Sequence, residues 1–320
     1  MTPRPGKPYS SGREVTGAGT QPGADRPLVS VLTTSYNHAR WLPDTLDSVR
    51  RQDWPRVEHV VVDDASSDGS IELLVGWPGR GLLWKTGPNQ GQARALNEAF
   101  RMSSGDIIGW LSSDDVYYDR GVVSAVVDAF SMHPRAALVY GHAVLINGYG
   151  LQLQGLWVPP VRILGWRPPM RIIQPAVFVR RSVLGDRIVD DSYDVAMDTE
   201  LWLRLHRSHP FVRLNRILAG ERHHPARKSY TMGVVMHDEG KRLEATFGTG
   251  RGTPLHRNSR IWGVILRVAG LSLIPRMQRY PSGFRGDLDS RIALVRRQVL
   301  VRRAEMPPGP APTRHRARGE

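Results

Sequence analysis

Short apolar runs alternate with amphipathic segments over the first third of the chain, from residue 27 to residue 118. Four strands are predicted from apolar, β-branched runs, at 28–34, 57–62, 82–84 and 107–111. Three helices are predicted between them from apolar residues at helical spacing, over 42–49, 71–75 and 93–102. This order with short connections is typical of a doubly wound, Rossmann-like α/β sheet with mostly parallel strands and flanking helices.

Polar clusters follow three of these strands. They are Thr34-Ser35-Tyr36, Asp63-Asp64 and Ser112-Ser113-Asp114-Asp115. Because the carboxyl ends of parallel strands lie at one edge of a sheet, where ligands bind, we expect one site there. The adjacent carboxylates of Asp114 and Asp115 repel each other, and a divalent cation would relieve that repulsion. From these residues alone, a strand-to-helix turn with Asp115 as an N-cap is an equal alternative.

Several function classes are disfavoured by what the sequence lacks. Residues 33–37 read Thr-Thr-Ser-Tyr-Asn where a dinucleotide-binding fold has Gly-x-Gly, and no Walker A loop occurs. A nicotinamide enzyme and a P-loop nucleotidase are therefore not expected. The 320 residues include no cysteine, which excludes disulfides, thiolate zinc sites and cysteine nucleophiles and agrees with a reducing compartment.

The second half of the chain has a less regular pattern. Further elements are predicted as a helix at 122–130, a strand or hairpin at 136–146, and strands at 176–179 and 211–218. Residues 151–173, rich in Pro, Trp and Gly, are either a loop that shapes a cleft or a plain connection. Asp198 begins another helix, where the helix dipole favours a carboxylate. A polar, cationic loop is expected at 222–229, and adjacent histidines such as His223 and His224 are more often exposed than metal-bound.

The formal net charge of +14 is concentrated near the C-terminus. Residues 240–320 hold 17 Lys/Arg and 5 Asp/Glu, whereas residues 27–239 hold 23 of each. A basic tail on a neutral body argues against a nucleic-acid groove across the core. It suits contact with an anionic surface such as lipid.

A basic helical extension is predicted over 240–305, with apolar residues at 261–274 and 288–303 among its arginines. It is either an interfacial membrane anchor or a set of helices packed on the preceding domain. Residues 1–26 are expected to form a disordered leader and residues 306–320 a disordered tail. No apolar stretch reaches the roughly 18–20 residues of a membrane span. We therefore expect a cytoplasmic protein, either free or peripheral on the inner face of the membrane.

Six segments in order resemble the family 2 glycosyltransferases, which are inverting enzymes with the GT-A nucleotide-sugar fold. The segments are 29–37, 61–70, 89–97, 109–115, 174–178 and 197–205. The resemblance implies a GT-A domain over 27–239, with a donor half at 27–118 and an acceptor half at 119–239. It implies metal-dependent transfer from a UDP-, GDP- or TDP-sugar to a hydroxyl of a glycan or lipid-linked acceptor, in polysaccharide or glycoconjugate synthesis. The alternative is a catalytically silent nucleotide-sugar-binding or scaffold protein with the same fold.

The resemblance also implies roles for individual residues. Asp198 matches the catalytic base, and Asp115 would ligate Mg²⁺ or Mn²⁺, with His224 as a second candidate ligand. Lys228 and Gln174 would contact the diphosphate or the acceptor. Donor binding is implied for Thr34, Tyr36, Asn37, Asp64, Arg94 and Asp114. Arg94 departs from the family pattern, because many relatives carry a small or acidic residue there.

Overall fold

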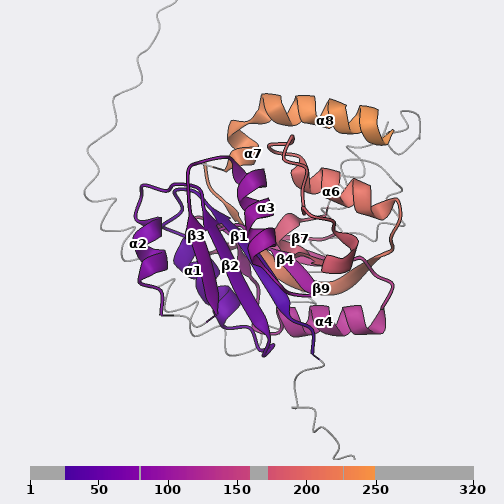
Figure 1. Ribbon diagram of the computed structural model, residues 1–320, viewed down its shortest axis with the longest axis horizontal. Helices are drawn as coiled ribbons and strands as arrows, with labels where there is room; N and C mark the ends of the chain where they lie inside the picture. The colour runs from indigo at the N-terminus through magenta and orange to yellow at the C-terminus, as the bar shows by residue number, and fades with distance from the viewer. Residues whose placement is uncertain (1–25, 79–80, 159–171, 226, 249–320) are drawn as a thin grey trace, which may run out of the picture.

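The computed structural model describes residues 26–78, 81–158, 172–225 and 227–248 (Figure 1). The predicted leader up to residue 25, the basic extension beyond residue 248 and the tail at 306–320 lie outside these residues. The described part is a mixed α/β structure built on a nine-stranded sheet, which confirms the predicted fold class. None of its helices is long and apolar enough to span a membrane.

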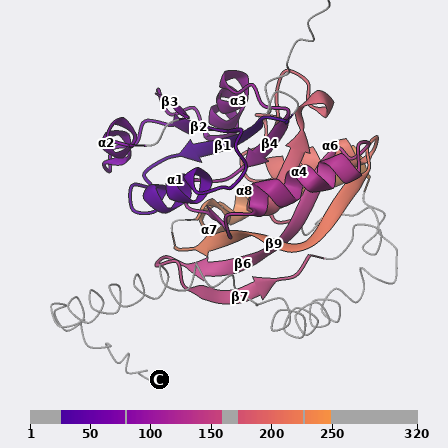
Figure 2. The same ribbon diagram turned by 90° about the horizontal axis from the view of Figure 1, so that it is seen from below.

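The strands follow the order β3-β2-β1-β4-β8-β6-β9-β5, with β7 paired to β6. Their bounds are β1 Val29–Ser35, β2 Val57–Asp63, β3 Leu82–Thr86, β4 Ile107–Trp110, β5 Val116–Tyr117, β6 Leu138–Asn147, β7 Gln152–Leu156, β8 Val177–Arg180 and β9 Phe211–His223. Strands β1 to β4 are mutually parallel, as predicted. The rest of the sheet is mixed, since β8 runs antiparallel to β4 and β6, while β6 and β9 are parallel. Figure 2 shows β6, β7 and β9 side by side.

Helices cover both faces of the sheet. Their bounds are α1 Leu42–Arg50, α2 Ser70–Val75, α3 Gln92–Met102, α4 Val122–Met132, α6 Met197–His206, α7 Lys228–Thr231 and α8 Gly233–Phe247. Alternate residues of a strand point to opposite faces, so Leu32 of β1 packs in a core with α3 and α6. Its neighbour Val31 packs in a second core with α4. Figure 1 shows α6 and α8 on the side of the molecule opposite α4.

Several elements differ from the pattern-based predictions. Strand β7 lies within the segment expected to be irregular, because it pairs with β6 through backbone bonds that its polar side chains do not signal. Strand β9 continues to His223, so the loop expected at 222–229 begins two residues later, at residue 224. The domain end expected at residue 239 falls inside α8, where both Glu239 and Leu243 are buried.

A substitution of Gly105, just before β4, would test how closely the chain packs at the centre of the parallel sheet. A Cβ there would lie 2.3 Å from Ser30 Oγ, 2.6 Å from Ser30 N and 2.8 Å from Leu28 O. Because two of these atoms are backbone, Gly105→Ala should lower the free energy of unfolding by about 1–3 kcal/mol in urea titrations. Gly185→Ala is the control, since a Cβ there meets nothing within 4 Å. Equal stability of the two variants would contradict this packing.

Candidate functional site

A cleft of about 510 Å³ opens at the carboxyl ends of β1, β2 and β4. Strand β1 lies between β2 and β4, where the strand order changes direction, which is where such sheets bind ligands. The volume falls within the roughly 300–1,000 Å³ of small-molecule sites. Most of the residues implicated by the sequence line this cleft, namely Thr34, Tyr36, Asp64, Asp114, Asp115, Gln174, Asp198 and Lys228.

The polar turn after β4 is held by side chains from distant parts of the chain. The hydroxyl of Thr45 in α1 donates to the carbonyls of Ser113 (2.9 Å) and Asp115 (2.7 Å). The amide of Gln174 donates to the carbonyl of Trp110 (2.6 Å) and accepts from the Ser112 hydroxyl (3.1 Å). The turn is therefore fixed from both sides before any ligand binds.

Arg222, near the end of β9, lies buried beneath this turn. Its Nε donates to the carbonyl of Asp114 (2.6 Å), and its backbone N–H donates to Asp115 Oδ1 (2.7 Å). Its guanidinium also donates to the Asn147 carbonyl (3.3 Å) and to Asp44 Oδ2 (3.2 Å). One buried arginine thus joins β9, α1 and the turn that carries the two carboxylates. The sequence predicted a polar, cationic loop at this residue, whereas the structure extends β9 through it and buries its side chain.

A group of metal-ligating side chains comprises His38, Asp114 and His224, whose ligand atoms all lie within 4.8 Å of one another. His224 Nε2 lies 2.9 Å from Asp114 Oδ2, and His38 Nδ1 lies 2.8 Å from Ser113 Oγ. His224 is buried, contrary to the expectation for adjacent histidines, and its ring packs against Trp41 with centroids 3.9 Å apart. Burial tends to raise the pKa of the Asp114 carboxyl, but the His224 hydrogen bond and the His38 charge outweigh it and lower that pKa.

The sequence assigned the cation to Asp115, but the structure groups Asp114 with the histidines instead. Asp115 also lines the cleft, yet its Oδ1 is taken by the backbone of Arg222. Burial, together with the charges of Asp114 and Glu221, raises its pKa well above the usual value. His38 was not predicted from the sequence. The available signal was its position three residues after the end of β1, beside the polar cluster there.

Asp198 lies in the first turn of α6, as predicted. It lines the cleft and comes from the second half of the chain. Burial raises the pKa of its carboxyl to about 6, although hydrogen bonds from the Thr199 amide and hydroxyl oppose that rise. A carboxyl with this pKa is largely ionised at pH 7 and yet basic enough to accept a proton. These are the properties of a general base.

The remaining donor-half residues have mixed placements. Tyr36 is half exposed at the cleft, with its ring available for stacking. Asp64 accepts the amides of Gln90 (2.8 Å) and Gly91 (2.9 Å), so it also fixes the loop that opens α3. Asn37 lies outside the cleft lining. Its φ is 54°, and its side chain accepts the amide of Ser67 (2.8 Å), which joins the loops after β1 and β2.

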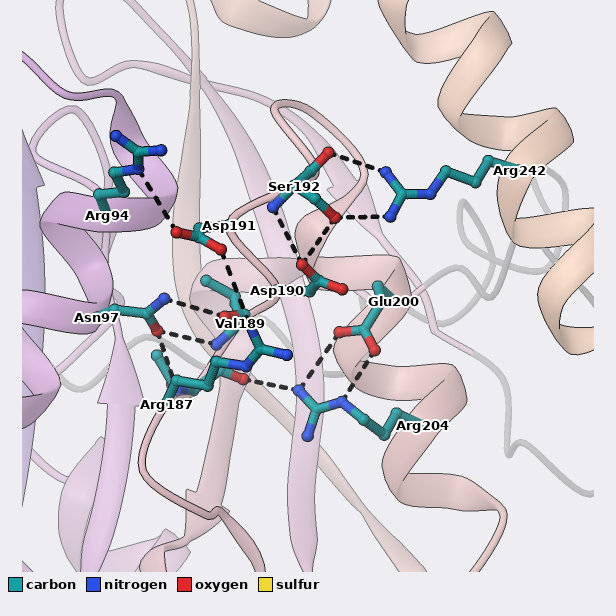
Figure 3. A network of polar contacts seen from close by, with 11 residues as sticks. Arg94, Asn97, Arg187, Val189, Asp190, Asp191, Ser192, Glu200, Arg204 and Arg242 are labelled. Carbon is teal, nitrogen blue, oxygen red and sulfur yellow. Dashed lines mark hydrogen bonds and ion pairs between the residues drawn. The ribbon is translucent and has the colours of Figure 1, made fainter.

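Arg94 also lies outside the cleft lining, within a network around the segment before α6 (Figure 3). Its guanidinium is exposed and lies 3.4 Å from Asp191. In the same network, the amide group of Asn97 bonds the backbone of Ile188 and Val189. Arg94 therefore contacts the acceptor half of the chain, and the cleft geometry gives its predicted donor role no support.

Two cations from the segment after β9 complete the described lining. Lys228 Nζ donates to the carbonyl of Asp194 (2.6 Å), and Arg227 pairs with Glu221 (2.6 Å). Burial lowers the pKa of the Lys228 ammonium, while the charges of Asp194, Glu239 and Asp64 counteract this. The cleft lining therefore carries the positive charges of Arg227 and Lys228 as well as the carboxylate of Asp114.

Residues 30–170 match the family model described as glycosyl transferase family 2. Residues 30–170, a little under half of the chain, are thus similar to the family 2 glycosyltransferases. An uncharacterized glycosyltransferase of Mycobacterium tuberculosis is 36% identical over 106 residues, or 33% of this chain and 40% of the relative. Another of Rickettsia felis is 27% identical over 213 residues, or 62% of this chain and 34% of the relative. The chain thus aligns with well under two thirds of either relative's length.

Solved structures show the same fold at low sequence identity. Residues 1–349 of S. aureus TarS superpose with a TM-score of 0.51 and 18% identity, covering 61% of this chain and 60% of that one. The mannosyltransferase PcManGT from Pyrobaculum calidifontis gives 0.53 and 18%, covering 85% and 81%. The glycosyltransferase domain therefore has the predicted GT-A type of fold.

Removal of the Arg222 guanidinium tests its role beneath the paired carboxylates. Arg222→Leu should lower the free energy of unfolding by about 3 kcal/mol or more, because it removes the buried donor to the carbonyls of Asp114 and Asn147 and the positive charge beside the two carboxylates. Arg50→Leu is the matched control, since its pair with Asp47 is half exposed and worth under about 1 kcal/mol. Chemical denaturation of both variants measures the difference. A loss for Arg222→Leu no larger than that of the control would contradict this role.

Proposed function

We propose that this protein is a metal-dependent, inverting glycosyltransferase that moves a sugar from a nucleoside diphosphate to an acceptor hydroxyl. The observation that carries the proposal is the opening of one cleft onto both a cation-ligand group and a carboxyl poised as a base. The first is formed by His38 and Asp114, which line the cleft, together with His224, which lies outside the lining and is buried beside Asp114. The second is Asp198, which also lines the cleft. The family 2 domain supplies the reaction class.

The donor set of the cation group fits a divalent transition metal. One carboxylate and two imidazoles offer both oxygen and nitrogen, a mixture that Mn²⁺ accepts more readily than Mg²⁺, which prefers oxygen ligands alone. The neighbour PcManGT was solved with GDP-Man and Mn²⁺. We therefore propose Mn²⁺, held by Asp114 and His224 with His38 as the third ligand. When bound, the ion would neutralise charge on the leaving diphosphate.

The chain's own residues would do the remaining work. Tyr36 stacks on the base of the donor, and Thr34 and Asp64 line the same end of the cleft. Lys228 adds positive charge where the diphosphate leaves. Asp198 accepts the proton of the acceptor hydroxyl as that oxygen attacks the anomeric carbon, and a single displacement inverts its configuration. Holding both substrates in one cleft contributes the orientation that such a displacement needs.

The substrates are proposed by class. TarS was solved with UDP-GlcNAc and with UDP, which supports a nucleoside diphosphate sugar as the donor. For the acceptor we propose a hydroxyl of a glycan or a lipid-linked glycan in surface polysaccharide or glycoconjugate synthesis. A peripheral position on the cytoplasmic face of a membrane remains a prediction from the charge of residues 240–320. The silent scaffold is the weaker alternative, because the groups required for chemistry share one cleft.

A thermal-shift screen tests the donor and the metal together. UDP-, GDP- and TDP-sugars are added with Mn²⁺, Mg²⁺ or EDTA, and the matching donor should stabilise by about 2.7 kcal/mol at about a hundredfold its Kd, only with Mn²⁺. Asp114→Ala should lose this metal-dependent shift, whereas Asp128→Ala, an exposed carboxylate of α4, should keep it. A shift that is equal in EDTA, or that survives Asp114→Ala, would refute the metal site.

Substitution of the proposed base tests the chemistry. Asp198→Asn should lower kcat by about 10²–10⁴-fold without changing the donor-induced thermal shift, because only proton removal is lost. In the wild type, kcat should fall about tenfold per pH unit below about pH 6, as the raised pKa of Asp198 leaves its carboxyl protonated there. Nucleotide release in the presence of acceptor measures both effects, with Asp186→Asn, at an exposed site, as the control. Equal, background-level nucleotide release by wild type and Asp198→Asn, with nucleotide still bound, would favour the silent scaffold. Equal release well above background would contradict the role of Asp198 as the base.

A further inference from the structure

The N-terminus of α6, which carries Asp198, is capped by a carboxylate from a different helix. Glu239 of α8 is buried, and its Oε2 accepts the amides of Val195 (2.9 Å) and Ala196 (2.8 Å). Its Oε1 accepts the amide of Asp194. Ala196 is the N-cap residue of α6, so its amide is one of those that have no partner within the helix, and a negative charge is favoured there. The amides of Asp194 and Val195 belong to the segment just before the helix. Glu239 therefore fixes the entry of the chain into α6 from more than forty residues away.

The sequence of α6 cannot supply this cap itself. The residue at its N-cap position is Ala196, which has no side-chain oxygen, and no side-chain cap bond is present there. Asp198, the second residue of the helix, is occupied with the amide and hydroxyl of Thr199. The start of α6 is thus defined by α8, and Val195, Met197 and Asp198 beside it line the cleft.

Helix α8 also contacts the segment before α6 through other side chains. Its Arg242 donates to the carbonyl (3.0 Å) and hydroxyl (2.6 Å) of Ser192, as Figure 3 shows, and lies 4.1 Å from the ring centroid of Tyr193. Its Leu243 is buried in the core shared with α6. On the side of the cleft, Lys228 Nζ of α7 donates to the carbonyl of Asp194 (2.6 Å). The amide of Asp194 donates to Glu239 of α8. Residues 192–196 are therefore hydrogen-bonded to side chains of both α7 and α8.

We propose that Glu239 is a positioning residue for the base Asp198, acting through the backbone of residues 194–196. The proposal rests on the proposed function, since it takes Asp198 to be the base. It makes α8 part of the acceptor side of the active site, although α8 contributes no side chain to the cleft lining. An amide at position 239 would keep one accepting oxygen but turn an NH₂ group toward a backbone N–H. Glu239→Gln should therefore loosen residues 194–196 with little change in volume.

Hydrogen exchange on the full chain tests this contact independently of any activity. Peptides covering residues 190–200 should exchange about tenfold faster or more in Glu239→Gln than in wild type, because buried bonds to a charged acceptor are lost. Asp238→Asn is the matched control on the same helix, since its carboxylate is exposed, and it should exchange like wild type. Glu239→Asp keeps the charge and should restore part of the protection. Unchanged exchange in folded Glu239→Gln would overturn the proposal.

Kinetics then test whether the contact serves the base. With Mn²⁺ and the donor that turns over fastest, Glu239→Gln should lower kcat by about 10–100-fold, leave KM for the donor within about twofold, and shift the acidic limb of the kcat–pH profile. Asp238→Asn should match wild type in all three. Wild-type values for Glu239→Gln, or a loss of kcat that only follows the folded fraction, would overturn the positioning role. A wild type without turnover would refute the proposed function alone, because exchange decides the contact.

Discussion

The buried guanidinium of Arg222 is the interaction on which the geometry of the cleft depends. Two adjacent carboxylates at the end of a core strand are unstable unless positive charge and hydrogen-bond donors surround them. Arg222 supplies both from β9, while Thr45 of α1 caps the neighbouring carbonyls. With Asp115 bonded inward to the Arg222 backbone, Asp114 is left beside the two histidines. Arg222 therefore separates the roles of the two aspartates, because its backbone N–H bonds the Asp115 carboxylate while its guanidinium bonds only the carbonyl of Asp114.

The cleft is assembled from halves of the chain with different kinds of structure. The parallel strands β1, β2 and β4 bring three loop ends to one edge, which follows from their shared direction. The second half contributes Asp198 to the lining from the start of α6, and it places His224, just after β9, beside Asp114. Because α8 and the network of Figure 3 hold the segment before α6, the position of Asp198 depends on contacts far from the chemistry.

Local pattern was sufficient for the first half of the fold and for the existence of a site. The parallel strands and their helices appear near the predicted positions, because apolar runs and helical spacing report burial directly. Pattern failed for β7, a short run of mixed polar and apolar residues, and for the end of β9 and the residue after it, where Arg222 and His224 are buried by their partners. A polar side chain that is buried by a distant partner carries no local signal of its burial.

The sequence by itself determined the α/β class, the edge of the sheet where the cleft lies, and the residue types available there, including the helix start at Asp198. Only the tertiary structure decided which residues meet. It placed His38 beside Asp114 and His224 and bonded Asp115 to the backbone of Arg222. It also left Arg94 on the surface and bonded Glu239 to the amides at the start of α6. The physical reason is that strand direction and periodicity are local properties, whereas a ligand set or a helix cap is completed by atoms that only folding brings into contact.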